Sequence, residues 1–179
     1  EALANANDNS DTTSGDCAAG TGIADVIRFA ITGSGLHTIS ATGTYSIDEQ
    51  VVIDGYSQAG SAVNTNASPL PFNGTLTIEI DMSGTSGIAF NLNSDNITLK
   101  GLVVHSAGGA LIAGRSADVH HTAIQGSYIN VDPTGMTQKT STNETITFGG
   151  GAHDNLIGGT NAADRNIIIG SPAQNAISI

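Results

Sequence analysis

Short apolar runs recur along the chain from Asp25 onward, and each run is bounded by Gly, Asn, Asp or Ser. The runs are rich in β-branched residues, which favours strands, and no window carries the 3.6-residue apolar stripe of a helix. The predicted strands are Val26–Ile31, Leu36–Ile39, Val51–Ile53, Leu76–Ile80, Ile88–Leu92, Ile97–Val104, Leu111–Ala113, Ala123–Ile129, Ile146–Phe148, Leu156–Ile157, Ile167–Ile169 and Ala176–Ile179.

The apolar runs recur at a regular spacing along the sequence. The segment 87–90 has its counterpart at 109–112, and the pair Asn96-Ile97 has its counterpart at Asp118-Val119. A repeat of roughly 20 to 25 residues made of short strands and tight turns is typical of a β-solenoid. A single coil cannot bury its own apolar face, whereas stacked coils pair their strands and share one interior. The sequence therefore predicts an all-β, right-handed parallel β-helix of about six coils.

Three insertions interrupt the period, at 57–75, 132–144 and 158–165. Insertions in a solenoid form loops on its side, where they are placed to make contacts. The first residues, Glu1 to Asn7, favour a short helix that caps the first coil. We therefore divide the chain into a cap and loop at 1–24 and the coils with their loops at 25–179.

The number and distribution of charged residues argue against some classes of binding partner. The net charge is −11, and the five cationic side chains are scattered along the sequence. A surface that follows phosphates needs clustered cations, so nucleic acid and anionic membranes are unfavourable partners. No apolar run approaches the roughly 20 residues of a membrane-spanning helix, so membrane insertion is not expected.

The coil residues carry a resemblance to a family. The segments 25–29, 33–39 and 52–60, and later 124–129, 132–135, 157–160 and 165–169, resemble the right-handed β-helices of large bacterial and archaeal secreted and surface proteins. Glu1-Ala2-Leu3 resembles the second half of that family's Cys-Ser/Thr-Leu-Arg-Glu-Ala capping segment. The resemblance implies an extracellular or cell-surface location. It specifies the fold well and the function poorly, because core and turn residues carry it.

The single cysteine, Cys17, lies in a polar, Gly-rich stretch. From the residues alone it is either an unpaired thiol or half of a disulfide whose partner is outside the chain. The resemblance favours a disulfide to a cysteine upstream of Glu1, since the family's capping segment begins with one and often has a second where Cys17 stands.

Carboxylates could bind a metal or act as acid and base. Aligning the coils places Asp54, Asp81, His105 and Asn130 at equivalent positions, which predicts a vertical polar row. We favour a ladder of turn residues over a metal or catalytic row. Glu79 alternates with apolar neighbours and is expected on a solvated outer face. The remaining oxygen-rich candidates for Ca²⁺, Asp8, Asp11 and Asp16, lack the spacing of an EF-hand and favour a surface loop.

No zinc-type cluster is evident in the sequence. His120 and His121 are adjacent, so strand alternation predicts that their rings point to opposite faces. His37, His105 and His153 are isolated. No cofactor is expected, and Ca²⁺ is the alternative that stays open.

Four Asn-x-Ser/Thr sequons begin at Asn66, Asn73, Asn96 and Asn143. The sequence is rich in Asn, Ser and Thr, and chance alone would give a similar number of sequons. All four asparagines are candidate glycosylation sites, and three of them, Asn66, Asn73 and Asn143, lie in predicted loops.

These observations favour a non-catalytic structural or adhesive segment of a secreted or surface protein. The alternatives are a carbohydrate-active β-helix enzyme and a carbohydrate-binding module. Ile177 and Ile179 alternate in the last predicted strand, whose open edge favours pairing with another chain. The expected partner is a second copy, joined end to end into filaments, or the rest of a longer chain; carbohydrate is an additional candidate.

Overall fold

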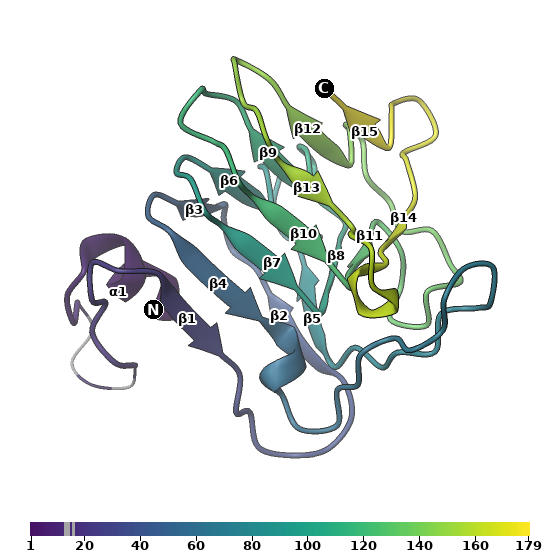
Figure 1. The fold of residues 1–179 in the computed structure, drawn as a ribbon, viewed down its shortest axis with the longest axis horizontal. Coiled ribbons are helices and arrows are strands. Elements are labelled where there is room, and N and C mark those ends of the chain that lie inside the picture. Colours follow the sequence, from purple (N-terminus) through teal and green to yellow (C-terminus); the bar gives the residue numbers. More distant parts are fainter. Residues whose placement is uncertain (13–14, 16) are drawn as a thin grey trace.

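The computed structural model describes residues 1–12, 15 and 17–179, and its strands form three parallel five-stranded sheets. Strands far apart in the sequence lie side by side because each coil contributes one strand to each sheet (Figure 1). Sheet A contains β1 (Asp25–Arg28), β4 (Val51–Asp54), β7 (Thr98–Lys100), β10 (Ala123–Gln125) and β13 (Leu156–Ile157).

Sheets B and C repeat this order. Sheet B contains β2 (His37–Ser40), β5 (Ile78–Asp81), β8 (Leu102–His105), β11 (Tyr128–Ile129) and β14 (Ile167–Ile168). Sheet C contains β3 (Tyr45–Ile47), β6 (Phe90–Leu92), β9 (Ile112–Gly114), β12 (Ile146–Phe148) and β15 (Ile177–Ser178). The three sheets define five coils rather than the expected six, and the stacking confirms the parallel β-helix.

The corner between sheets A and B is tight. Two predicted strands, Ile97–Val104 and Ala123–Ile129, are each split in two by a glycine with positive φ, Gly101 at +68° and Gly126 at +58°. Only glycine adopts this left-handed conformation without steric cost, so the chain turns there from one sheet into the next. These corners account for two of the differences between predicted and observed strands.

The interior between the sheets is apolar. Coil residues such as Leu99, Leu102 and Ile112 are at most 1% exposed, and they stack on equivalent residues of the coils above and below. The central coils bury their apolar side chains fully, while Leu156 and Ile177 in the last coil are 48% and 40% exposed.

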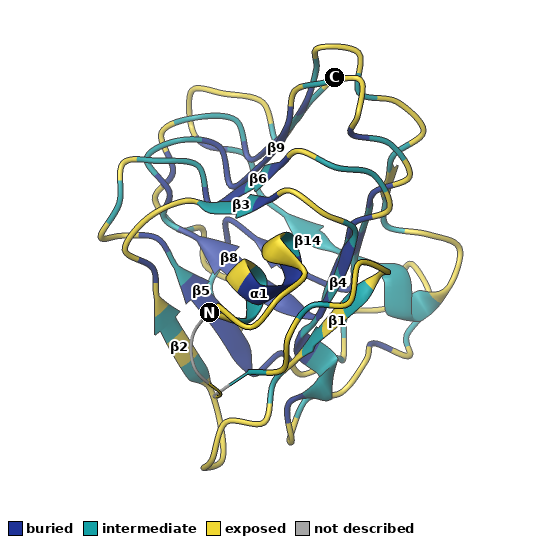
Figure 2. Cartoon of the chain, turned by 90° about the vertical axis from the view of Figure 1, so that its left-hand side faces the viewer, coloured by how far each residue is buried: buried dark blue, intermediate teal, exposed yellow. Residues whose placement is uncertain are grey.

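The predicted capping helix is confirmed as α1 (Ala2–Asp8), which lies across the open end of the first coil (Figure 2). Leu3 and the 3%-exposed Ala6 pack on the core. Asn7 joins the helix to the first coil, because its Nδ2 donates to Ser46 O at 2.9 Å and its Oδ1 accepts from Asp48 N at 3.0 Å. An apolar cavity of about 220 Å³ remains between the helix and the coil interior.

A second, smaller apolar cluster lies outside sheet B. Leu76, Val103, Tyr128 and Val131 are its buried members, and Phe72 from the first inserted loop packs edge-on against Tyr128 with ring centroids 5.0 Å apart. The loop between η1 (Gly55–Ser57) and β5 therefore folds back over the outer face of the sheet. This cover changes which polar side chains of sheet B meet solvent.

Candidate functional site

A cleft lies at the corner between sheets A and B. It has a volume of about 350 Å³, and its lining comes from several coils and two inserted segments: Asp54, Tyr56, Ser57, Val63, Lys100, Gln125, Ala163 and Asp164. One wall of the cleft is formed by residues at the ends of neighbouring sheet A strands. Asp54 is the register partner of Lys100, and Lys100 is the register partner of Gln125. Parallel stacking alone thus brings three residues distant in sequence into one column.

An ion pair spans two coils in this column. Lys100 Nζ lies 3.1 Å from Asp54 Oδ2, with the side chains 36% and 19% exposed. Asp54 Oδ1 also accepts from Tyr56 N at 3.1 Å, which fixes the carboxylate as the cap of η1. A partly exposed pair of this kind stabilises a fold by at most about 1 kcal/mol, so its main effect is to present a donor and an acceptor side by side.

Tyr56 fills the corner because the glycines of the next coils leave room for it. A Cβ on Gly101 would lie 2.7 Å from the Tyr56 ring, and one on Gly126 would lie 2.4 Å from Tyr56 Oη. The hydroxyl donates to Gly126 O at 2.7 Å. Burial, followed by the negative fields of Tyr128, Asp54 and Asp164, raises the pKa of Tyr56 to about 12, so the ring is neutral at physiological pH.

Two inserted segments far apart in sequence are joined beside the cleft. Arg165 Nη1 donates to Asn66 O at 2.7 Å and to Leu70 O at 3.0 Å, while Asn64 Nδ2 donates to Ala162 O at 2.7 Å. Asp164 ends η2 (Ala162–Asp164) and accepts from Asn161 N at 3.0 Å. These bonds hold the first and third inserted segments together, and the sequence gives no signal of them.

Glu79 is buried, not solvated as predicted. It is 7% exposed, and its Oε1 lies 2.8 Å from Nε2 of His105, itself 2% exposed, while Thr38 Oγ1 donates to Oε2. Asp81 Oδ1 lies 3.6 Å from His105 Nδ1. This group joins the first three coils on the outer face of sheet B, where Glu79 and His105 are almost closed to solvent.

The predicted polar row is only partly correct. Asp81 is the register partner of His105, and Asn130 follows Ile129, which pairs with Val104, so these three share a column. Asp54 belongs to sheet A and pairs with Lys100 instead, because the corner at Gly101 separates the two sheets. Across residues 1–12, 15 and 17–179, no group of three or more His, Cys, Asp or Glu side chains is arranged to hold a metal ion.

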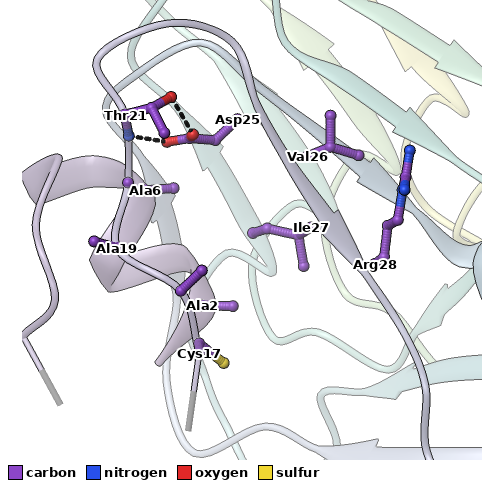
Figure 3. A pocket seen from close by; sticks show the side chains of 11 residues that line it. Ala2, Ala6, Cys17, Ala19, Thr21, Asp25, Val26, Ile27 and Arg28 are labelled. Atoms are coloured by element: carbon purple, nitrogen blue, oxygen red, sulfur yellow. Dashed lines mark hydrogen bonds between the residues drawn. The ribbon is translucent and has the colours of Figure 1, made fainter. Parts of the chain in front are cut away.

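A second cavity, of about 430 Å³, lies between α1, the segment at 17–21 and β1 (Figure 3). The Cys17 side chain is at its edge, and Thr21 closes one end by donating to Asp25 through its backbone and its hydroxyl. Asp8 and Asp11 are exposed, whereas Asp16 lies outside the described residues. Cys17 has no partner cysteine within the chain, and its disulfide to an upstream cysteine stays a prediction.

The side-chain amides of all four sequon asparagines donate hydrogen bonds. Asn66 Nδ2 donates to Pro71 O, Asn73 Nδ2 to Thr65 Oγ1, Asn96 Nδ2 to Asp95 Oδ2 and Asn143 Nδ2 to Gly108 O. Asn73 and Asn96 are exposed, while Asn66 and Asn143 are half-buried. Glycosylation at any of them stays a prediction.

The two adjacent histidines do not point to opposite faces. His121 has a φ of +54°, so it leaves the extended conformation in which side chains alternate. The rings of His120 and His121 meet at 88° with centroids 4.8 Å apart, and His153 stacks on His120 from the next coil. The predicted opposite orientation of these two rings was therefore wrong.

The chain matches no family profile, no curated protein and no solved structure. No helix among the residues described is long and apolar enough to cross a membrane.

Proposed function

We propose that this chain is a non-catalytic structural or adhesive β-helix segment of a secreted or cell-surface protein. The observation that carries the proposal is the use of its acid–base groups. Glu79 and His105, the one close carboxylate–imidazole pair that is buried in the described chain, connect coils and are almost closed to solvent. A general acid or base must come within hydrogen-bond reach of its substrate, and these groups cannot.

The resemblance of the coil segments to secreted and surface β-helices supports the location. The dense stacking of short strands provides a rigid rod, which suits a segment that displays or spaces other parts of a surface protein.

A screen for turnover tests the non-catalytic assignment. The 179-residue chain is incubated with a panel of neutral and acidic polysaccharides, with and without Ca²⁺, and new chain ends are measured. We expect no turnover. Turnover that Asp54→Asn or Asp81→Asn removes without unfolding the chain would contradict the proposal.

The end of the last coil supports a role in assembly. Ile177 and Ile179 are 40% and 94% exposed, and β13, β14 and β15 are paired on one side only. We propose that a further coil pairs with this edge, from a second copy or from the rest of a longer chain. Light scattering of the chain against the double variant Ile177→Lys, Ile179→Lys measures the first case. Equal masses for both at high concentration would exclude pairing between copies.

The cleft favours a second candidate, a carbohydrate-binding module. It combines a neutral aromatic ring, a cation, two carboxylates and an amide, and sugar hydroxyls need such paired donors and acceptors. A glycan array compares the chain with Lys100→Ala and with the control Lys139→Ala. Binding that Lys100→Ala removes and Lys139→Ala keeps would favour this candidate, and binding unaffected by either would exclude the cleft.

A further inference from the structure

The corner between sheets C and A repeats one arrangement in three successive coils. In each coil two consecutive polar residues touch through their side chains, and the second is left-handed, with φ of 51° at Asn96, 54° at His121 and 53° at Asp154. Backbone pairing keeps the coils aligned, since Asn96 N donates to His120 O at 3.0 Å and His120 bridges to His153.

The second of these three coils, which contains His120 and His121, differs from the other two in its side-chain contact. Asn96 Nδ2 donates to Asp95 Oδ2 at 2.6 Å, and His153 Nδ1 lies 2.9 Å from Asp154 Oδ2, so each of these pairs joins a donor to a carboxylate. In the middle coil two imidazole nitrogens face each other instead, with His120 Nδ1 2.7 Å from His121 Nδ1. At this distance one of the two Nδ1 atoms must carry a proton that it donates to the other. If neither carried one, the lone pairs of both nitrogens would point at each other.

The surroundings hold these rings in place and leave them reachable. His120 stacks on His153 with centroids 5.1 Å apart at 15°, and His153 is in turn held by Asp154. His121 is exposed and His120 half-buried, so an ion can approach from solvent. The Asp154 carboxylate contributes a negative charge at the same corner, in a chain whose net charge is −11.

We propose that His120 and His121 form a chelating site for one divalent transition-metal ion of the zinc class. Zn–N distances of about 2.0–2.1 Å at a tetrahedral angle separate two ligand nitrogens by about 3.4 Å, so the rings need to open by about 0.7 Å. The N–H proton on one Nδ1 moves to Nε2 of the same ring, and both neutral rings then offer Nδ1 to the ion. Water completes the coordination, and His153 acts as a positioning residue.

The ligand set defines the class of ion. Imidazole nitrogen suits Zn²⁺, Cu²⁺ and Ni²⁺, whereas Ca²⁺ and Mg²⁺ prefer oxygen. The site is therefore separate from the carboxylates considered for calcium, and it needs no third protein ligand beyond the imidazole pair.

Titration calorimetry with zinc chloride on the folded 179-residue chain tests the site. We expect one Zn²⁺ per chain and none for magnesium chloride at the same concentration. His121→Asn removes one ligand but keeps the corner, because Asn96 adopts the same left-handed conformation one coil below. This variant should lose zinc binding, while the control His37→Gln should keep it.

His153→Gln separates positioning from ligation. It should weaken zinc binding by about tenfold without abolishing it, as expected for a residue that orients a ligand. Nitrogen NMR of the imidazoles reports the ligating atoms, with the Nδ1 signals of His120 and His121 shifting on addition of zinc. Absence of zinc binding by the unmodified chain, or equal affinity in folded His121→Asn, would overturn the proposal.

Discussion

Single residues in left-handed conformations decide which polar side chains meet at the corners of this β-helix. At His121 a positive φ turns the ring toward His120, although the alternation of an extended strand would separate them. At Gly101 and Gly126 the same conformation lets the chain turn without a Cβ and leaves space for Tyr56. Asn, Asp and His favour a positive φ more than other non-glycine residues, but most residues of these types adopt other conformations. Residue type alone therefore did not place the contact between His120 and His121.

Gly126 is the sharpest test of the corner. Gly126→Ala adds a Cβ that would lie 2.4 Å from Tyr56 Oη, at a residue with φ of +58°. The clash and the left-handed strain should lower the free energy of unfolding by about 2–3 kcal/mol. Gly149→Ala is the matched control, since its Cβ would meet nothing within 4 Å, and it should change stability by less than about 0.5 kcal/mol. Urea denaturation measures both, and equal midpoints would contradict the packing described.

Tyr56 should titrate late and affect stability at alkaline pH. Its pKa in the folded chain is raised to about 12 by burial, so folding favours the neutral phenol. A group whose folded pKa is raised contributes stability that is complete below its unfolded pKa, about 10, and is lost as pH rises through the folded value. The stability should therefore fall between about pH 10 and 12, and less so in Tyr56→Phe. Phenolate absorbance shows the order of titration, and an unshifted Tyr56 would contradict its buried position.

At the scale of elements, most of the coil could be predicted from apolar runs, since short β-branched stretches between turn residues specify strands. The strand β3 (Tyr45–Ile47) was missed because its run, Tyr-Ser-Ile, is short and half polar. The burial of Glu79 was missed for a different reason. Alternation correctly turned it outward, but an outward side chain was expected to meet solvent. The buried pairing with His105 depends on a residue 26 positions away, in the next coil.

The hydrogen bonds from Arg165 should restrict the motion of the first inserted loop. Arg165→Gln removes a guanidinium that donates to the carbonyls of Asn66 and Leu70. The loop around these residues should then open more often, because of the bonds described between the two inserted segments only the one from Asn64 Nδ2 to Ala162 O would remain. Limited proteolysis should cut between residues 64 and 73 faster in Arg165→Gln than in the unmodified chain. Arg115→Gln, an exposed arginine elsewhere, is the control, and equal cutting in both variants would argue against the contact.

For the molecule as a whole, stacking makes stability depend on neighbouring coils. Each coil contacts mainly the coil before and the coil after it, so interior side chains of the middle coils are buried from both sides. In solenoids the stability is approximately the sum of the stabilities of the single coils and of the interfaces between neighbouring coils. An end coil has only one such interface, so it opens at a lower free energy than a coil in the middle. The half-exposed side chains of the last coil fit this gradient.

The gradient leads to a prediction that distinguishes local from global opening. Leu99→Ala in the third coil removes a side chain that is 1% exposed and should lower the free energy of global unfolding by about 3 kcal/mol. Ile157→Ala in the last coil removes a half-buried side chain, so it should cost about 1 kcal/mol and mainly speed the opening of β13, β14 and β15. Hydrogen exchange followed by mass spectrometry resolves the two cases. Leu99→Ala should accelerate exchange in the middle coils and leave the amides of β13, β14 and β15, which exchange by local opening, little changed. Ile157→Ala should leave the amides of β4, β5, β7 and β8 unchanged. Uniform acceleration by both variants would mean that the five coils unfold as one unit, because opening of the last coil would then require opening of the rest.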